Sequence, residues 1–264
     1  MPSIAQRING ERLVILSWSR AILMQLVHPL IAAGVLQHSS FRGDVVQAAV
    51  RLHHTIRAML ALTFGDDRQR EAALSRIGGI HRTVNGTLTS AVGPFTAGTR
   101  YSAEDPALLL WVHATLVDSA VEVYQRIVAP LSESERDDFC VESAAVLHAL
   151  GGDPAVTPLT WSAMRQYIMQ VEASGVLALT DETRALGGAV LAPHAAGLPV
   201  PLTGLQRLVT IGLLPPLIRD GYRFEWDPAR EARLTRALDR LRRLRGVLPL
   251  AIAQWPEARR LRRA

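Results

Sequence analysis

The sequence predicts an all-α protein, and three observations support this. Hydrophobic residues make up 48% of the 264 residues but aromatic residues only 5%, and Ala and Leu dominate, which suits helices better than a sandwich or barrel. Apolar residues recur at helical spacing, and no segment of useful length alternates as a strand does. The length is ample for one large core. We therefore expect a single helical domain over residues 1–264, with about nine helices and a core over about residues 11–220.

The first half of the chain predicts three long helices. The first runs from about Glu11 to Val27 and is broken at Pro29, with His28 at the break. The second covers Val45–Leu62, begins at Asp44 as N-cap, and is apolar nearly all round, so we expect it to be buried. Gly65-Asp66-Asp67 ends it and starts the third helix, which we expect to reach Thr89.

The second half predicts further helices from their start and stop signals. Ser102, Asp105 and Pro106 start a helix that reaches about Val128 and carries Trp111, His113 and Asp118. The remaining expected helices are Arg136–Leu150 after a capping box at Ser132, Pro158–Leu177 after Thr157 as N-cap, Thr180–Leu191, Gly204–Ile218 with a break at Pro215-Pro216, and a last helix after Asp227-Pro228 with Leu234, Leu238, Leu241 and Leu244 on one face.

Positive charge is concentrated at the C-terminus. All 29 positive residues are Arg, and the formal net charge is +5. Residues 230–263 contain eleven Arg against Glu231, Asp239 and Glu257, a local net charge of +8 that leaves −3 for the rest. We expect this basic helix, residues 228–263, to present a solvated face, since it lacks interleaved aromatic residues; contact with nucleic acid or anionic lipid is the less favoured alternative. No nucleic-acid partner is expected.

Cysteine usage and hydropathy indicate a cytoplasmic protein. Cys140 is the single cysteine, so no internal disulfide can form, and we expect it to be a small buried hydrophobe. The apolar stretch Leu13–Gly34 is interrupted by Arg20 and Pro29, so no run reaches the roughly 18–20 residues of a spanning helix. We expect a buried amphipathic helix there and no transmembrane span.

Polar residues within the second and third helices form the candidate site. Arg51, His54 and Thr55 fall on one side of the helix 45–62 at about 100° per residue. His81 lies in an apolar stripe of the next helix, close to Gly78-Gly79, and each of these glycines costs about 1 kcal/mol relative to Ala. Two facing helices of this kind could hold a flat cofactor between them.

The residue pattern alone leaves other interpretations open. A lone histidine on an apolar face, such as His81, His113 or His28, is more often a hydrogen-bonded core residue than a ligand. Arg51 on a buried helix needs an anionic or carbonyl partner, either a cofactor carboxylate or a structural partner such as Asp44 or Asp118. Nucleotide-binding loops, a nucleophile elbow, HExxH and CxxC are absent, and no ExxH pair supports a di-iron bundle.

A series of short motifs resembles the mpaB-type and rubber oxygenase (latex-clearing protein) catalytic domain over about residues 11–220. Each motif is weak alone, but their order and spacing together are fairly specific. They are Gln25-Leu-Val-His28-Pro29, Ala33-Gly34, His38-Ser39, Arg51-x-x-x-Thr55, Phe64-Gly65-Asp66, Ile80-His81-x-x-Val84-x-Gly86, Gly98-x-x-Tyr101-x-Ala103-x-Asp105-Pro106 and Trp111-Val-His113-Ala-Thr115-Leu-Val-Asp118-Ser119.

The resemblance implies a globin-like helical core that binds haem b and uses dioxygen on an apolar small-molecule or lipidic substrate. His81 matches the proximal iron ligand, and Arg51 and Thr55 match the Arg and Thr of the haem pocket. His28 and His113 lie in other matching motifs and are further candidates for contact with the cofactor.

Two departures from the family pattern matter. Rubber-cleaving members carry a Lys where this chain has His54, and they use a Glu upstream of the Arg that has no match before Arg51. Rubber cleavage is therefore not expected, and His54 becomes a candidate catalytic residue or sixth iron ligand. The leading hypothesis is a haem-dependent oxygenase. The alternatives are a non-catalytic haem-binding or gas-sensing protein and a family member that has lost its cofactor. A homo-oligomer is possible.

Overall fold

The computed structural model describes residues 2–38, 45–192 and 200–261 and confirms the all-α prediction. The described residues form fourteen α-helices, one 3-10 helix and one two-stranded antiparallel sheet. The helices outnumber the nine expected because prolines start several short ones, as at Pro29, Pro216 and Pro256. The globin-like arrangement implied by the resemblance stays a prediction.

The elements in chain order are α1 (Ile4–Asn9), η1 (Arg12–Ile15), α2 (Leu16–Leu26), α3 (Pro29–His38), α4 (Val45–Phe64), α5 (Asp67–Thr83), β1 (Asn85–Thr87), β2 (Arg100–Ser102), α6 (Pro106–Ile127), α7 (Glu133–Ala149), α8 (Trp161–Ala173), α9 (Asp181–Val190), α10 (Val200–Leu213), α11 (Pro216–Gly221), α12 (Pro228–Val247), α13 (Leu250–Ala253) and α14 (Pro256–Leu261).

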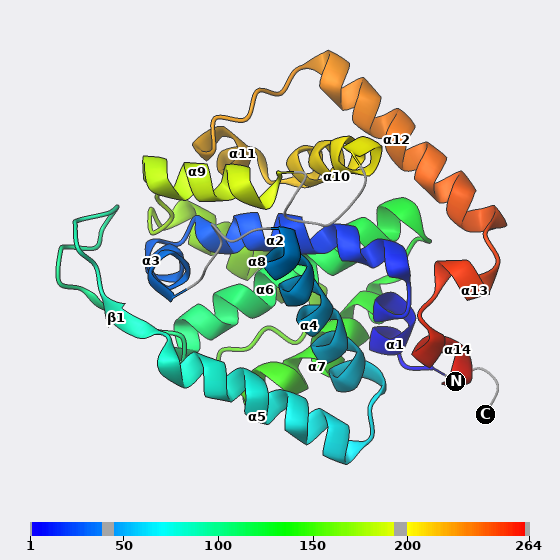
Figure 1. Ribbon diagram of the computed structural model, residues 1–264, viewed down its shortest axis with the longest axis horizontal. Coiled ribbons are helices and arrows are strands. Elements are labelled where there is room, and N and C mark those ends of the chain that lie inside the picture. The colour runs from blue at the N-terminus through cyan, green and yellow to red at the C-terminus, as the bar shows by residue number, and fades with distance from the viewer. Residues whose placement is uncertain (1, 39–44, 193–199, 262–264) are drawn as a thin grey trace.

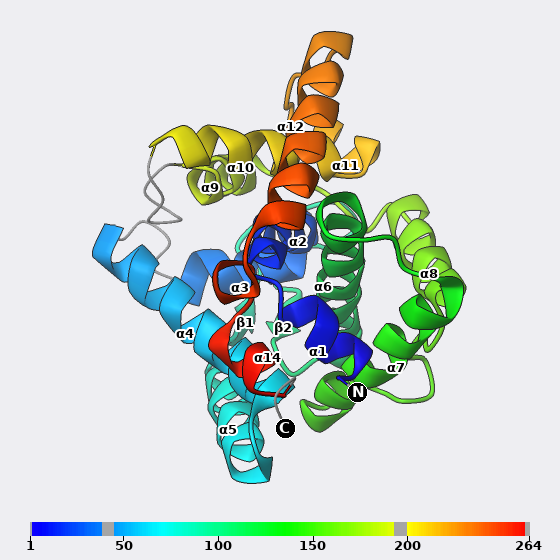
Figure 2. The same ribbon diagram turned by 90° about the vertical axis from the view of Figure 1, so that its right-hand side faces the viewer.

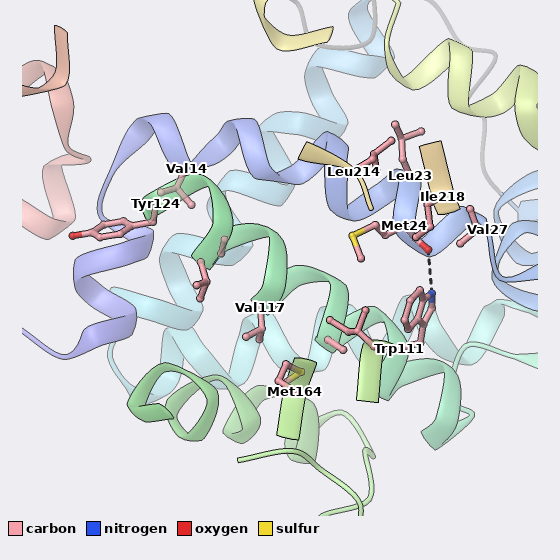
Figure 3. Packing of buried hydrophobic residues seen from close by; sticks show 14 of the residues in the cluster. Val14, Leu23, Met24, Val27, Trp111, Val117, Tyr124, Met164, Leu214 and Ile218 are labelled. Carbon is pink, nitrogen blue, oxygen red and sulfur yellow. Dashed lines mark hydrogen bonds between the residues drawn. The ribbon is translucent and has the colours of Figure 1, made fainter. Parts of the chain in front are cut away.

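The pair α2 and α6 forms the centre of the molecule (Figures 1 and 2). Trp111 of α6 is almost fully buried, and its Nε1 donates a hydrogen bond to the Met24 carbonyl of α2 at 3.1 Å (Figure 3). Helices α7 and α8 pack on α6, while α9 and α10 pack on α2, and α12 contacts both α6 and α10. Cys140 is fully buried on α7, as expected of a small hydrophobe, and burial raises the pKa of its thiol to about 12.

Most predicted helix starts are confirmed by their caps. Asp66 and Ser132 form capping boxes, and Thr180 caps α9. Asp227 caps α12. Asp105 rather than Ser102 caps α6, because Ser102 instead pairs with Asn85 in the two-stranded sheet. Pro follows each cap at the first helical position. The N-cap predicted at Thr157 is wrong: Thr160 caps α8, because the Thr157 hydroxyl instead donates to the Asp153 carbonyl. The predicted cap Asp44 lies outside the described residues.

The apolar N-terminal stretch is buried, as predicted. It forms η1 and α2, then turns by 108° into α3 at Pro29. By length and composition one described helix, α6, could cross a membrane, but 78% of its apolar window is buried inside the protein. Burial on this scale is the mark of a core helix.

Helices α4 and α5 depart most from expectation. No residue of α5 is buried, and none of the described side chains of α4 is buried, so the prediction of a buried helix over Val45–Leu62 is wrong. The chain also leaves the helix at Thr83 instead of continuing to Thr89, and β1 then pairs with β2. Pairing places Gly86 opposite Tyr101, where an added Cβ would lie 2.7 Å from the Tyr101 hydroxyl. This close approach requires glycine.

Candidate cofactor site on helices α4 and α5

Helices α4 and α5 form a hairpin beside the core (Figures 1 and 2). Arg70 of α5 joins them by donating to the Leu62 and Gly65 carbonyls. The hairpin keeps a set of apolar side chains half-exposed, namely Leu52, Ile56, Met59, Leu60, Leu74 and Ile77, while Ile80 is 55% exposed. The apolar surface predicted around His81 therefore exists, but it is not covered by the core.

His81 lies in the last turn of α5 with its ring half-buried. Its Nδ1 is buried and has no hydrogen-bond partner among the residues that the structure describes. Burial lowers the pKa of the imidazole below its usual value, and the negative charge of Glu104 only partly opposes this. The ring is therefore neutral at pH 7, which is the form of histidine that binds metals.

Gly78 and Gly79 leave an open surface on the same helix, one turn before His81. A Cβ added at either position would meet only the Arg82 guanidinium, at 3.6 and 3.7 Å, among the described residues. No neighbouring helix therefore explains why α5 carries two glycines in succession. A flat ligand lying against the helix would explain them, because it could approach the backbone closely.

His28 is the candidate histidine nearest the N-terminus. It occupies the break between α2 and α3, and its ring is 5.6 Å from the Phe95 ring. Burial lowers its pKa to about 4, Asp105 opposes this, and its Nδ1 is buried without a partner. The charges that act on the two pKa values belong to neighbouring residues of the chain, Glu104 for His81 and Asp105 for His28.

His113 is the candidate histidine of α6. It is buried on α6 with its Nε2 unpartnered, and burial lowers its pKa to about 4. The charge that acts on its pKa besides burial belongs to His148 of α7. The described contacts do not bring His113 together with His81.

The candidate residues of α4 share one helix, as predicted. His54 and Thr55 are exposed, whereas the side chain of Arg51 lies outside the described residues. His54 Nδ1 is 3.4 Å from Nη2 of Arg76 on α5. Because a guanidinium has only donors, His54 Nδ1 accepts and its Nε2 carries the ring proton. His54 therefore presents a hydrogen-bond donor on its free side.

Asp118 of α6, one of the two acids suggested as a structural partner of Arg51, already forms ion pairs with other arginines. Asp118 is 1% exposed, and its Oδ2 lies 2.8 Å from Arg20 Nη2 while its Oδ1 pairs with Arg165. Asp118 is thus committed to two other arginines. The other suggested partner, Asp44, lies outside the described residues.

Three contributors were not predicted as site residues: Glu104, Phe95 and Arg76. Each acts across the chain rather than along one helix; Arg76, for example, is 22 residues from His54. The sequence offers one clue that Arg76 belongs to the site, since it lies five residues before His81 on the same helix. The contact of Arg76 with His54 could not be read from the sequence, because it depends on how α4 and α5 pack against each other.

The donors present restrict the kind of metal that the site can hold. Among the described residues, no group of three His, Cys, Asp or Glu side chains could hold a free metal ion. His81 by itself fits only a metal that brings its remaining ligands with it, as haem iron does. A groove of about 530 Å³ between α10 and α12 contains none of the predicted site residues.

Fold and site together define a helical protein with a candidate prosthetic-group site at a single histidine. The family model for "ER-bound oxygenase mpaB/B'/Rubber oxygenase, catalytic domain" matches residues 6–247. The chain therefore belongs to this family, and the resemblance read from its motifs is confirmed. Since the family is defined by an oxygenase catalytic domain, the chain is an enzyme domain of the oxygenase type.

Two relatives are similar to most of the chain. The uncharacterized protein Mb2261 of Mycobacterium bovis and the uncharacterized protein Rv2237 of Mycobacterium tuberculosis are each 26% identical to it over 239 residues. The match covers 86% of this chain and 87% of each relative. No solved structure matches the chain.

Proposed function

We propose that the protein is a haem b-dependent oxygenase that uses dioxygen on an apolar small-molecule or lipidic substrate, with His81 as the iron ligand. The observation that carries the proposal is the neutral, half-buried ring of His81 with its unpaired Nδ1, one turn after the open surface at Gly78 and Gly79. Family membership supports the oxygenase part of the proposal.

Haem, when bound, would supply the iron chemistry that activates dioxygen. His81 would hold the iron through its neutral ring, and the two glycines would let the macrocycle approach α5. Arg51, which stays charged at all relevant pH values, and Thr55 would bind the propionates or polarise the side of the cofactor that α4 faces. His54 would donate a hydrogen bond from Nε2 there.

The apolar side chains of the hairpin would bind and orient the substrate. Leu52, Ile56, Met59 and Ile77 are half-exposed, so a hydrophobic molecule or cofactor that covered them would remove apolar area from water. The same cover would exclude water from the reacting centre, which strengthens the polar contacts made there.

Haem titration tests the proposal. We expect the purified protein to bind haem with a Soret band, and His81→Ala to lower haem affinity by at least about tenfold, as loss of a ligand or its support does. His53→Ala is the matched control, since His53 is an exposed histidine on α4 and should leave the titration unchanged. Added imidazole should restore the band in His81→Ala. A Soret band that is identical in wild type and His81→Ala would refute the assignment.

The two alternatives have less structural support. A non-catalytic protein with both His54 and His81 on the iron needs an unprotonated His54 Nε2, which the Arg76 contact opposes. A protein that has lost its cofactor needs His81 satisfied by protein groups, but its Nδ1 has no partner in the described part of the chain. Dioxygen consumption by the haem-loaded protein with long-chain apolar substrates separates an oxygenase from both.

A further inference from the structure

The outward face of α12 carries a stripe of arginines. Arg233, Arg236, Arg240 and Arg243 are spaced by three, four and three residues, so they share one side of the helix, roughly opposite the buried residues Leu234, Leu238 and Leu241. All four are exposed, and among the described residues none has an ion-pair partner. The helix lies along an outer edge of the molecule (Figure 1).

This stripe ends in a cluster of exposed apolar residues at the corner between α12 and α13. The cluster consists of Leu244, Val247, Leu250 and Ile252, which are 48%, 79%, 42% and 55% exposed. The sequence places Leu244 with the buried leucines, but this prediction is wrong, because Leu244 turns outward beside the arginines. Four apolar side chains at a single corner leave a hydrophobic surface without cover from the described residues.

The corner is held firmly in place, so the exposure does not come from a frayed chain end. Arg245 pairs with the buried carboxylate of Glu11, and Gln254 Nε2 donates to the same carboxylate at 2.6 Å. The Trp255 backbone N–H donates to the Gly10 carbonyl, and Arg242 donates to the Gln125 carbonyl. These contacts tie both sides of the corner to the N-terminal segment and to α6.

Positive charge extends beyond the helix. Arg233 also lines the groove of about 530 Å³, together with Arg207 of α10 and Arg223. Arg223 has φ 60°, a left-handed conformation that is costly for a residue with a side chain. Arg223 thus adds a further arginine to the groove next to the stripe, where it also pairs with Asp181 at 3.8 Å and where Glu225 is the acidic lining residue.

We propose that this surface, the α12 arginine stripe together with the apolar corner, docks the protein on an anionic lipid bilayer. An amphipathic surface with arginines beside exposed apolar residues suits the bilayer interface, where apolar side chains enter the acyl boundary and arginines meet the headgroups. A nucleic acid would use the stripe but not the corner. A second copy would set like charges against each other. The proposal does not depend on haem or on oxygenase activity.

Co-sedimentation with vesicles tests the proposal. The intact protein should bind vesicles of an equal mixture of phosphatidylcholine and phosphatidylglycerol, and bind vesicles of phosphatidylcholine alone much more weakly. Arg240→Gln with Arg243→Gln should weaken binding by about tenfold or more, since each arginine near an anionic surface contributes roughly a factor of five. Val247→Ser with Ile252→Ser should also weaken it. Added salt should weaken the wild-type interaction.

Matched controls separate a local surface from net charge or general hydrophobicity. Arg68→Gln with Arg100→Gln removes the same charge elsewhere, and Val141→Ser with Val156→Ser removes two other exposed apolar side chains, which are 53% and 60% exposed. Both controls should bind as the wild type does. Equal loss in the controls, or no binding to anionic vesicles, overturns the proposal. So does a dimer in solution that Val247→Ser with Ile252→Ser dissociates, or tight binding to duplex DNA that this variant leaves unchanged.

Discussion

Arg20 of α2 and Asp118 of α6 form an ion pair within the core, with 2.8 Å between Nη2 and Oδ2 and each side chain under 5% exposed. The contact is electrostatic rather than a well-aligned hydrogen bond, because Oδ2 has no partner of good hydrogen-bond geometry. Arg20 also donates to Ser119 Oγ and to the Leu213 carbonyl of α10, both at 2.7 Å. One guanidinium thus joins three helices at the centre of the fold.

Asp118→Asn should destabilise the protein by about 3–5 kcal/mol, because the buried Arg20 charge loses its counter-charge. The measurement is the free energy of unfolding in urea. Glu122→Gln on the same helix is the matched control: its pair with Arg126 is half-exposed and should contribute less than about 1 kcal/mol. Equal effects in the two variants would contradict a central role for the pair.

Gly78→Ala and Gly79→Ala should move stability and haem binding in opposite directions. A methyl group meets only Arg82 at ordinary contact distance, so each substitution should stabilise the haem-free protein by about 0.5–1 kcal/mol. The same methyl would stand where we propose that haem approaches α5, so haem affinity should fall. Thermal unfolding and haem titration measure the two effects. Unchanged haem affinity would place the cofactor elsewhere.

Arg76→Leu should change the spectrum of the haem-loaded protein. Without the guanidinium, His54 Nδ1 can take the ring proton and leave Nε2 free to bind iron. We expect a shift toward a low-spin spectrum in Arg76→Leu and none in Arg76→Leu with His54→Ala. A wild-type protein that is already low-spin through His54 would disprove this tautomer assignment.

Stability should fall as the pH falls from about 6.5 toward 4. His28 and His113 each have a pKa lowered to about 4 by burial, so the folded state keeps them neutral while the unfolded state protonates them near the usual 6.5. The unfolded state therefore binds more protons across this window, and each histidine contributes a slope of up to about 1.4 kcal/mol per pH unit. Urea unfolding of His113→Gln should give a shallower pH dependence than the wild type. The exposed variant His38→Gln should keep the wild-type slope.

The fold class and most helix starts are readable from the sequence because their signals are local. The side chains of Asp66, Asp105 and Ser132 each accept a hydrogen bond from a backbone N–H two or three residues later. Pro29 interrupts the helical stretch because it lacks a backbone N–H. Family membership is likewise carried by short motifs in a fixed order. The helix predicted to reach Thr89 fails because the pairing of β1 with β2, which depends on a strand 15 residues away, competes with it.

The sequence by itself determined an all-α chain of the mpaB/rubber oxygenase family, with His81 on one helix and Arg51, His54 and Thr55 on the one before it. Only the tertiary structure decided that these helices lie beside the core, that His28 and His113 are buried, and that Asp118 pairs with Arg20. The physical reason is the distance along the chain over which each kind of interaction acts. Periodicity and capping act within a few residues, whereas burial and ion pairing depend on which distant helices come into contact.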